Sequence, residues 1–109
     1  MNDTSIEAIV ALAKAAQAQY EAEGSQARYN RAAQAVAWAI MEPARNRDLA
    51  ELAVQTTGLG NVPDKITKNH RKTFGLMHDL KDAVTFGVMS DDPTSGITEI
   101  ARAKGVVAA

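Results

Sequence analysis

The sequence predicts an α+β chain in which four helices precede a β-hairpin and the beginning of a buried strand. Apolar residues recur at helical spacing through residues 1–83. After Asp82 the pattern changes, and β-branched or aromatic residues alternate with others. A turn cluster, Asp91–Gly96, separates two such runs. We therefore expect a helical part over residues 1–83, a hairpin over 84–102 and the start of a strand over 103–109.

The first helix is expected to begin at Thr4, because Thr4 and Glu7 have the spacing of a capping box. Gly24 should end it, and Ser25 can then cap a second helix over residues 26–41. The apolar stripe of the first helix consists of Ile6, Ile9, Val10, Ala13 and Tyr20. The stripe of the second consists of Tyr29, Ala33, Val36, Ala37 and Ile40.

A third helix is expected over residues 44–56, because the residue before Pro43 disfavours helical backbone and separates it from the second helix. Its predicted buried residues are Leu49, Leu52 and Ala53. Alanine-rich stripes allow close helix packing, as in a small bundle.

The fourth helix is expected over residues 63–80, after an elbow at Gly58 and Gly60. Glycine takes positive φ without a Cβ penalty, and Asn61 can cap the new helix. The predicted core residues are Ile66, Thr73, Leu76, Met77 and Leu80. Because an interior glycine costs about 1 kcal/mol relative to alanine, we expect a close packing contact at Gly75.

The hairpin is expected to pair Val84–Met89 with Ile97–Ala101. The apolar run Gly105–Ala109 has the composition of a buried parallel strand, which needs neighbours that this sequence does not supply.

The composition favours part of a larger protein. Of 109 residues, 46% are hydrophobic but only 5% aromatic, so an isolated core would be thin. The net charge of −1 argues against general nucleic-acid or anionic-membrane binding. With no cysteine, no signal peptide and no apolar run long enough to span a bilayer, the sequence predicts a cytoplasmic chain.

No residue of the chain is predicted to be catalytic, cofactor-binding or metal-binding. Lys65, Lys68, Arg71 and Lys72 could hold phosphates, but a solvated helix face is favoured. Gly58-Leu-Gly60 follows a helix and lacks the third glycine of a dinucleotide fingerprint. The remaining candidates have plainer interpretations as surface, turn or packing residues, namely His70, His78, Asp91, Asp92, Tyr20, Tyr29 and Trp38.

Two blocks of the sequence nevertheless resemble a known family, the CoA-acylating aldehyde dehydrogenases, in their N-terminal region. The resemblance covers roughly residues 50–109 well, and the first third only in helical character. The matching residues are Glu51–Val54, Thr57–Asn61, Asp64–Ile66, Lys68-Asn69, Phe86–Val88, Asp92-Pro93, Gly96–Thr98, Ile100-Ala101 and Gly105–Ala109.

This resemblance implies that the chain is an N-terminal fragment of an α/β enzyme. Residues 1–83 would then belong to a nicotinamide-binding domain, 84–102 to a hairpin that forms a homo-oligomer, and 103–109 to the first Rossmann-like strand. The family uses NAD or NADP with coenzyme A as co-substrate, and a cysteine that is absent here attacks the aldehyde. The implied substrates are acetaldehyde, propanal, a semialdehyde acid or sulfoacetaldehyde, and Arg71–Gly75 loosely resembles the sulfoacetaldehyde-using branch.

Two alternatives remain open from the sequence. One is a non-enzymatic helical module that binds a partner through its hairpin edge. The other is a regulator that binds phosphate or coenzyme A through the helix face at residues 65–72.

Overall fold

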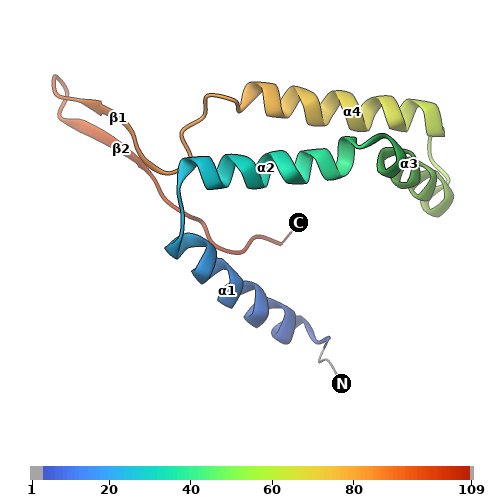
Figure 1. The fold of residues 1–109 in the computed structure, drawn as a ribbon, viewed down its shortest axis with the longest axis horizontal. Helices are drawn as coiled ribbons and strands as arrows, with labels where there is room; N and C mark the ends of the chain where they lie inside the picture. Colours follow the sequence, from blue (N-terminus) through green and yellow to red (C-terminus); the bar gives the residue numbers. More distant parts are fainter. Residues whose placement is uncertain (1–3, 109) are drawn as a thin grey trace. The chain divides into compact units, whose positions relative to one another are not determined.

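The computed structural model describes residues 4–108, and within them it contains four helices followed by a two-stranded antiparallel hairpin. The predicted α+β class is therefore confirmed (Figure 1). The chain divides into two compact units. One contains the chain up to Tyr29 together with the segment from Val84 onward, and the other contains Asn30–Ala83.

In the first unit, helix α1 spans Ile6–Ala22, and Ser5 caps it by accepting a hydrogen bond from the Ala8 N–H at 3.2 Å. The capping box predicted at Thr4 and Glu7 is therefore wrong, because the hydroxyl that caps the helix belongs to Ser5, one residue later. Ser25 begins α2 as predicted, because its hydroxyl accepts from the Arg28 N–H at 3.1 Å. Helix α2 spans Gln26–Met41, the predicted range, and continues into the second unit.

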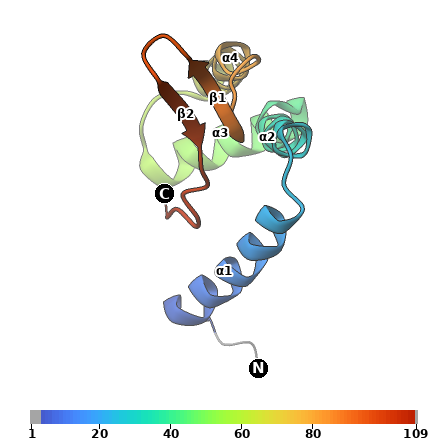
Figure 2. The ribbon, with the colours of Figure 1, turned by 90° about the vertical axis from the view of Figure 1, so that its left-hand side faces the viewer.

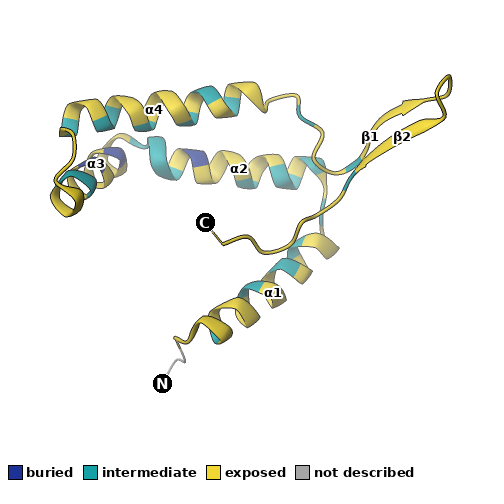
Figure 3. Ribbon diagram, turned by 180° about the vertical axis from the view of Figure 1, so that it is seen from behind, coloured by how far each residue is buried: buried dark blue, intermediate teal, exposed yellow. Residues whose placement is uncertain are grey.

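The core of the described chain is thin, as the composition predicts. Its buried hydrophobic residues are Ala37 and Ala50 (Figure 3). The predicted stripe of α1 is largely uncovered, with Ile6 71% and Ile9 53% exposed. Two alanines bury little apolar area, so burial inside this chain contributes little of the free energy that folding needs.

Helix α3 spans Pro43–Thr57 and begins at Glu42, whose carboxylate accepts from the N–H groups of Ala44 and Arg45 at 3.2 and 2.9 Å. The bonds from Arg45 and then Ala44 lower the pKa of the Glu42 carboxyl. This cap therefore stabilises the helix at neutral pH, and its contribution is lost as the pH falls through the lowered value.

The buried face of α3 differs from the prediction. Leu49 and Leu52 are 40% and 54% exposed, whereas Asn46 and Ala50 are buried. Asn46 and Ala50 lie one helical turn apart, and α4 packs against α3. The pattern of apolar residues did not identify the buried face of α3, because Asn46 on that face is polar.

Helix α4 spans Val62–Asp79 and begins as predicted, with Asn61 accepting from the Asp64 N–H at 2.9 Å. The Asn61 amide also donates to the Asp64 carboxylate at 2.7 Å. In the preceding elbow, Gly58 and Gly60 have φ of 67° and 74°, where a side chain would be strained.

The close contact predicted at Gly75 is absent, since no described atom beyond its chain neighbours and its own helix backbone lies within 4 Å of the position that a Cβ would take. Gly75→Ala should therefore raise the free energy of unfolding by about 1 kcal/mol, because alanine restricts the unfolded backbone and favours helix. Urea denaturation followed by circular dichroism measures this change. A loss of stability would mean that another part of the protein packs against this position.

The hairpin consists of β1, Gly87–Asp92, and β2, Ile97–Ala101, which lie side by side in Figure 2. Strand β1 begins three residues later than predicted, because Gly87 pairs with Ala101 at the end of β2. The register shifts between Val88 and Ser90, which leaves Met89 as a bulge.

The hairpin turn is built on Asp92. Its carboxylate accepts from the Thr94 N–H at 2.9 Å and from the Ser95 hydroxyl at 2.6 Å. The bond from Ser95, followed by that from Thr94, lowers the pKa of the Asp92 carboxyl. Gly96 closes the turn with φ of 71°.

The strand predicted at Gly105–Ala109 is not formed over the described residues 105–108. Val107 is 73% exposed. A strand needs a neighbour for its backbone hydrogen bonds, and the only described sheet here is the two-stranded hairpin. Ala109 lies outside the described residues.

Candidate functional site

An aromatic cluster joins α1, α2 and the base of the hairpin within the first unit. The ring centroids of Tyr20 and Tyr29 lie 4.9 Å apart, and those of Tyr29 and Phe86 lie 5.6 Å apart, both edge-to-face. The Arg28 guanidinium lies 5.7 Å from the Tyr20 ring centroid. Tyr20 and Tyr29 are therefore packing residues, as predicted, whereas Trp38 is 60% exposed.

Gln26 ties this cluster to the hairpin. Its amide nitrogen donates to the Thr85 hydroxyl at 2.8 Å, and its amide oxygen accepts from the Thr85 N–H at 2.7 Å. A hollow beside the cluster is lined by Tyr20, Glu21, Arg102 and Lys104, among others. The Thr85 hydroxyl in this lining accepts a hydrogen bond from the Gln26 amide, which is not a base that activates a nucleophile.

The second hollow lies on α4 and brings together three of the four predicted cations. It is lined by Asp64, Thr67, Lys68, Arg71 and Lys72. Lys65 is not in its lining and instead lies beside Gly60, where the Lys65 Cε is 3.4 Å from the position that a Cβ on the glycine would take. The structure therefore separates Lys65 from the other three.

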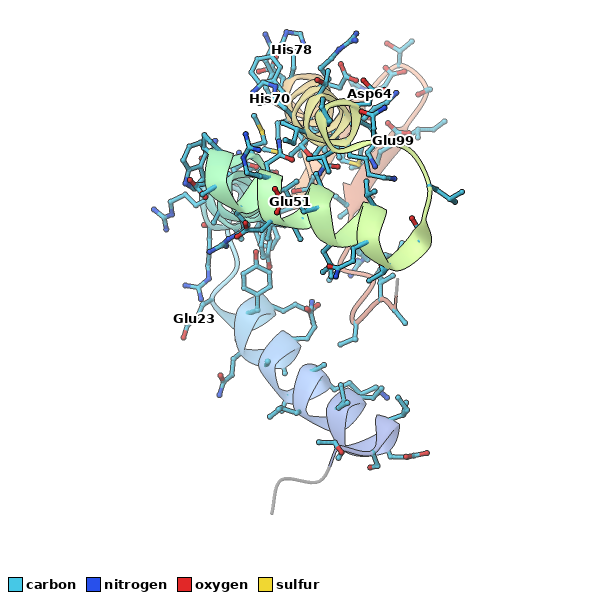
Figure 4. The ribbon with its side chains drawn as sticks, turned by 90° about the vertical axis from the view of Figure 1, so that its right-hand side faces the viewer. Glu23, Glu51, Asp64, His70, His78 and Glu99 are labelled. Carbon is cyan, nitrogen blue, oxygen red and sulfur yellow. The ribbon has the colours of Figure 1, made fainter. Side chains whose placement is uncertain are left out.

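The two histidines of α4 do not form a metal or catalytic site with described groups. His70 stacks on Phe74 with ring centroids 6.0 Å apart. The Nδ1 of His78, which is labelled in Figure 4, lies 3.8 Å from the Asp79 carboxylate, and both side chains are exposed. Among residues 4–108, no group of three His, Cys, Asp or Glu side chains is arranged to hold a metal ion.

Neither the glycine pair nor the aspartate pair fits a cofactor or catalytic role. Gly58 and Gly60 follow a helix, whereas a dinucleotide fingerprint follows a strand. Asp91 accepts from the Thr98 hydroxyl at 2.7 Å, and Asp92 holds the turn. The glycine pair therefore lacks the strand that precedes a dinucleotide fingerprint, and the chain has no cysteine.

Comparison with known proteins connects this scaffold to one enzyme class. The chain is 60% identical over 104 residues to the sulfoacetaldehyde dehydrogenase (acylating) of Cupriavidus necator. It is 40% identical over 75 residues to the protein of the same name from Bilophila wadsworthia, and 32% identical over 108 residues to the succinate-semialdehyde dehydrogenase (acetylating) of Clostridium kluyveri. No family model and no solved structure matches it.

These matches cover 95%, 69% and 99% of this chain, but only 21%, 16% and 23% of the respective relatives. The chain thus spans about a fifth of the length of the curated relatives that it matches. It belongs to the acylating aldehyde dehydrogenase family, as its sequence resemblance predicts. Within that family, the relatives named for sulfoacetaldehyde support the branch suggested by the sequence.

The structure also bears on the membrane. None of its described helices combines the length and the apolar character that a bilayer-spanning segment requires.

Proposed function

We propose that this chain is the N-terminal part of an NAD(P)-dependent, CoA-acylating aldehyde dehydrogenase that converts a short aldehyde to its acyl-CoA. The observation that carries the proposal is the 60% identity to the Cupriavidus necator enzyme over 95% of the chain. The extensive exposure of apolar side chains supports it, since such surfaces are expected to be covered in a larger protein.

Among the candidate substrates, we favour sulfoacetaldehyde. Two relatives, at 60% and 40% identity, carry that substrate in their names, and a relative named for succinate semialdehyde is 32% identical. Acetaldehyde and propanal are the competing substrates. The proposed chemistry needs a cysteine and a nicotinamide site, which must come from outside residues 1–109 because these residues contain no cysteine and no fitting dinucleotide motif.

The hairpin at residues 84–102 is proposed to join subunits of a homo-oligomer. It has two strands, and therefore each strand leaves one edge without a partner in the described chain. Residues 1–83 are assigned to the nicotinamide-binding domain and 103–109 to the entry of its first strand. A cytoplasmic location and the absence of nucleic-acid partners stay predictions of the sequence.

The proposal is tested by purifying the protein as its gene encodes it and following nicotinamide reduction with each aldehyde. Reduction should require coenzyme A, and kcat/KM for sulfoacetaldehyde should exceed that for acetaldehyde by at least about tenfold. A polypeptide of residues 1–109 alone should be inactive. Absence of CoA-dependent reduction with every aldehyde, or activity from residues 1–109 alone, would contradict the proposal.

A further inference from the structure

Helix α4 carries a concentrated positive charge on the side that faces away from its packed residues. Residues 65–72 contain four lysines or arginines and no carboxylate. Lys68, Arg71 and Lys72, which we call the α4 basic face, line one hollow together with Thr67. At 100° per residue these side chains lie on the side opposite Ile66, Asn69 and Thr73, which are half-buried.

The α4 basic face is not neutralised within the described chain. No carboxylate of residues 4–108 forms an ion pair with Lys68, Arg71 or Lys72, although other cations of the chain do form such pairs. The one carboxylate that lines the hollow, Asp64, is hydrogen-bonded to the Asn61 amide at the start of the helix. Like charges three and four residues apart repel, so Lys68, Arg71 and Lys72 carry an electrostatic cost, which Asp64, four residues before Lys68, offsets only in part.

We propose that the α4 basic face binds a phosphate group of a ligand. Arg71 can donate two parallel hydrogen bonds to phosphate oxygens, Lys68 and Lys72 supply compact positive charges beside it, and Thr67 offers a hydroxyl. Three cations thus line the hollow against the single carboxylate of Asp64, so its charge is positive overall. The phosphate can come from free phosphate or from coenzyme A. Binding of coenzyme A rests on the proposed function, whereas binding of free phosphate does not.

Isothermal titration calorimetry of the protein with inorganic phosphate, coenzyme A and 3′-dephospho-coenzyme A tests this site. Arg71→Glu should weaken binding of the phosphate-bearing probe by at least about tenfold, because it replaces a charge-assisted bond with repulsion. Arg31→Glu is the matched control. Arg31 is also an exposed arginine of the second unit, and this substitution should change the affinity by less than about twofold.

The three probes identify the source of the phosphate. If coenzyme A binds more tightly than its dephospho form, and Arg71→Glu removes the difference, then the site holds the 3′-phosphate of coenzyme A. If inorganic phosphate binds as tightly as coenzyme A, with the same loss in Arg71→Glu, then the site takes free phosphate. A second variant, Lys68→Gln, should also weaken binding, and helical circular dichroism confirms that each variant is folded.

The proposal is overturned if the protein binds none of the probes, or if Arg71→Glu and Arg31→Glu have equal effects. Binding is measured without turnover. A protein that binds phosphate but oxidises no aldehyde would therefore refute the proposed function and leave this site standing, and the reverse result would refute this site alone.

Discussion

Replacing Val88 and Ile100 together with lysine should convert the assembled protein into monomers. The two residues pair across the hairpin, and their side chains are 58% and 51% exposed. If the hairpin joins subunits, each contact buries these apolar groups, and a buried aliphatic side chain contributes about 1.5–3 kcal/mol. Lysine at an open strand also opposes pairing with another strand. The mass from light scattering should fall by at least about twofold.

The control for this variant raises the net charge equally but in the second unit, outside the hairpin. Gln34→Lys with Gln55→Lys places two lysines on exposed positions of α2 and α3. This control should keep the oligomeric mass of the unmodified protein. If the Val88 and Ile100 variant also keeps that mass, the subunit interface lies elsewhere.

Helix ends could be predicted from the sequence because they depend on chemistry within a few residues. The hydroxyl of Ser25 and the amide of Asn61 each bond an N–H three residues ahead, as their positions in the sequence suggested. At the first helix the sequence predicted Thr4 as the cap, whereas Ser5 is the cap in the structure, because the two adjacent residues carry equivalent hydroxyls. Only the geometry of the folded helix decides between them.

Burial and strand boundaries could not be predicted in the same way, because they depend on residues distant in sequence. Strand β1 does not begin at Val84, and the Thr85 N–H bonds the side chain of Gln26, 59 residues earlier in the chain. Likewise, Leu49 and Leu52 have the apolar character of core residues, but α4 packs where Asn46 and Ala50 lie. The strand predicted at Gly105–Ala109 is not formed over residues 105–108, because an apolar composition does not supply the neighbouring strand that it needs.

For the candidate site, the sequence identified Lys65, Lys68, Arg71 and Lys72 as cations of one helix, but not which of them lie together. Lys65 lies beside Gly60, apart from the α4 basic face. Residue spacing on a helix does not show this separation, because it depends on the direction that the long Lys65 side chain takes toward the elbow.

Asn46→Ala should lower the free energy of unfolding by about 2–3 kcal/mol, a large fraction of the stability of a typical domain. Asn46 is 3% exposed and links two helices. Its amide nitrogen donates to the Ile66 carbonyl at 3.0 Å, and its amide oxygen accepts from the Asn69 amide at 2.9 Å. Alanine removes both bonds and leaves the Asn69 amide without this acceptor in a part-buried position, while the gap left by the side chain adds a packing loss.

Urea denaturation of Asn46→Ala, Asn69→Ala and the double variant separates the two bonds. The double variant should lose about 1 kcal/mol less than the sum of the single variants, which is the coupling expected of one buried hydrogen bond. Gln55→Ala removes an exposed amide from the same helix and should change stability by less than about 0.5 kcal/mol. Strict additivity of the single variants would mean that Asn46 and Asn69 do not interact.

Asn46→Asp distinguishes the hydrogen-bond pattern from simple polarity. Aspartate has nearly the same shape and can still accept from the Asn69 amide, but an ionised carboxylate cannot donate to the Ile66 carbonyl. It also places an unpaired charge at a buried position, which raises the cost. We therefore expect Asn46→Asp to lose at least as much stability as Asn46→Ala at neutral pH. A stable Asn46→Asp protein would show that the amide donor to α4 is dispensable, and that α3 and α4 are held together by the contacts around Ala50 instead.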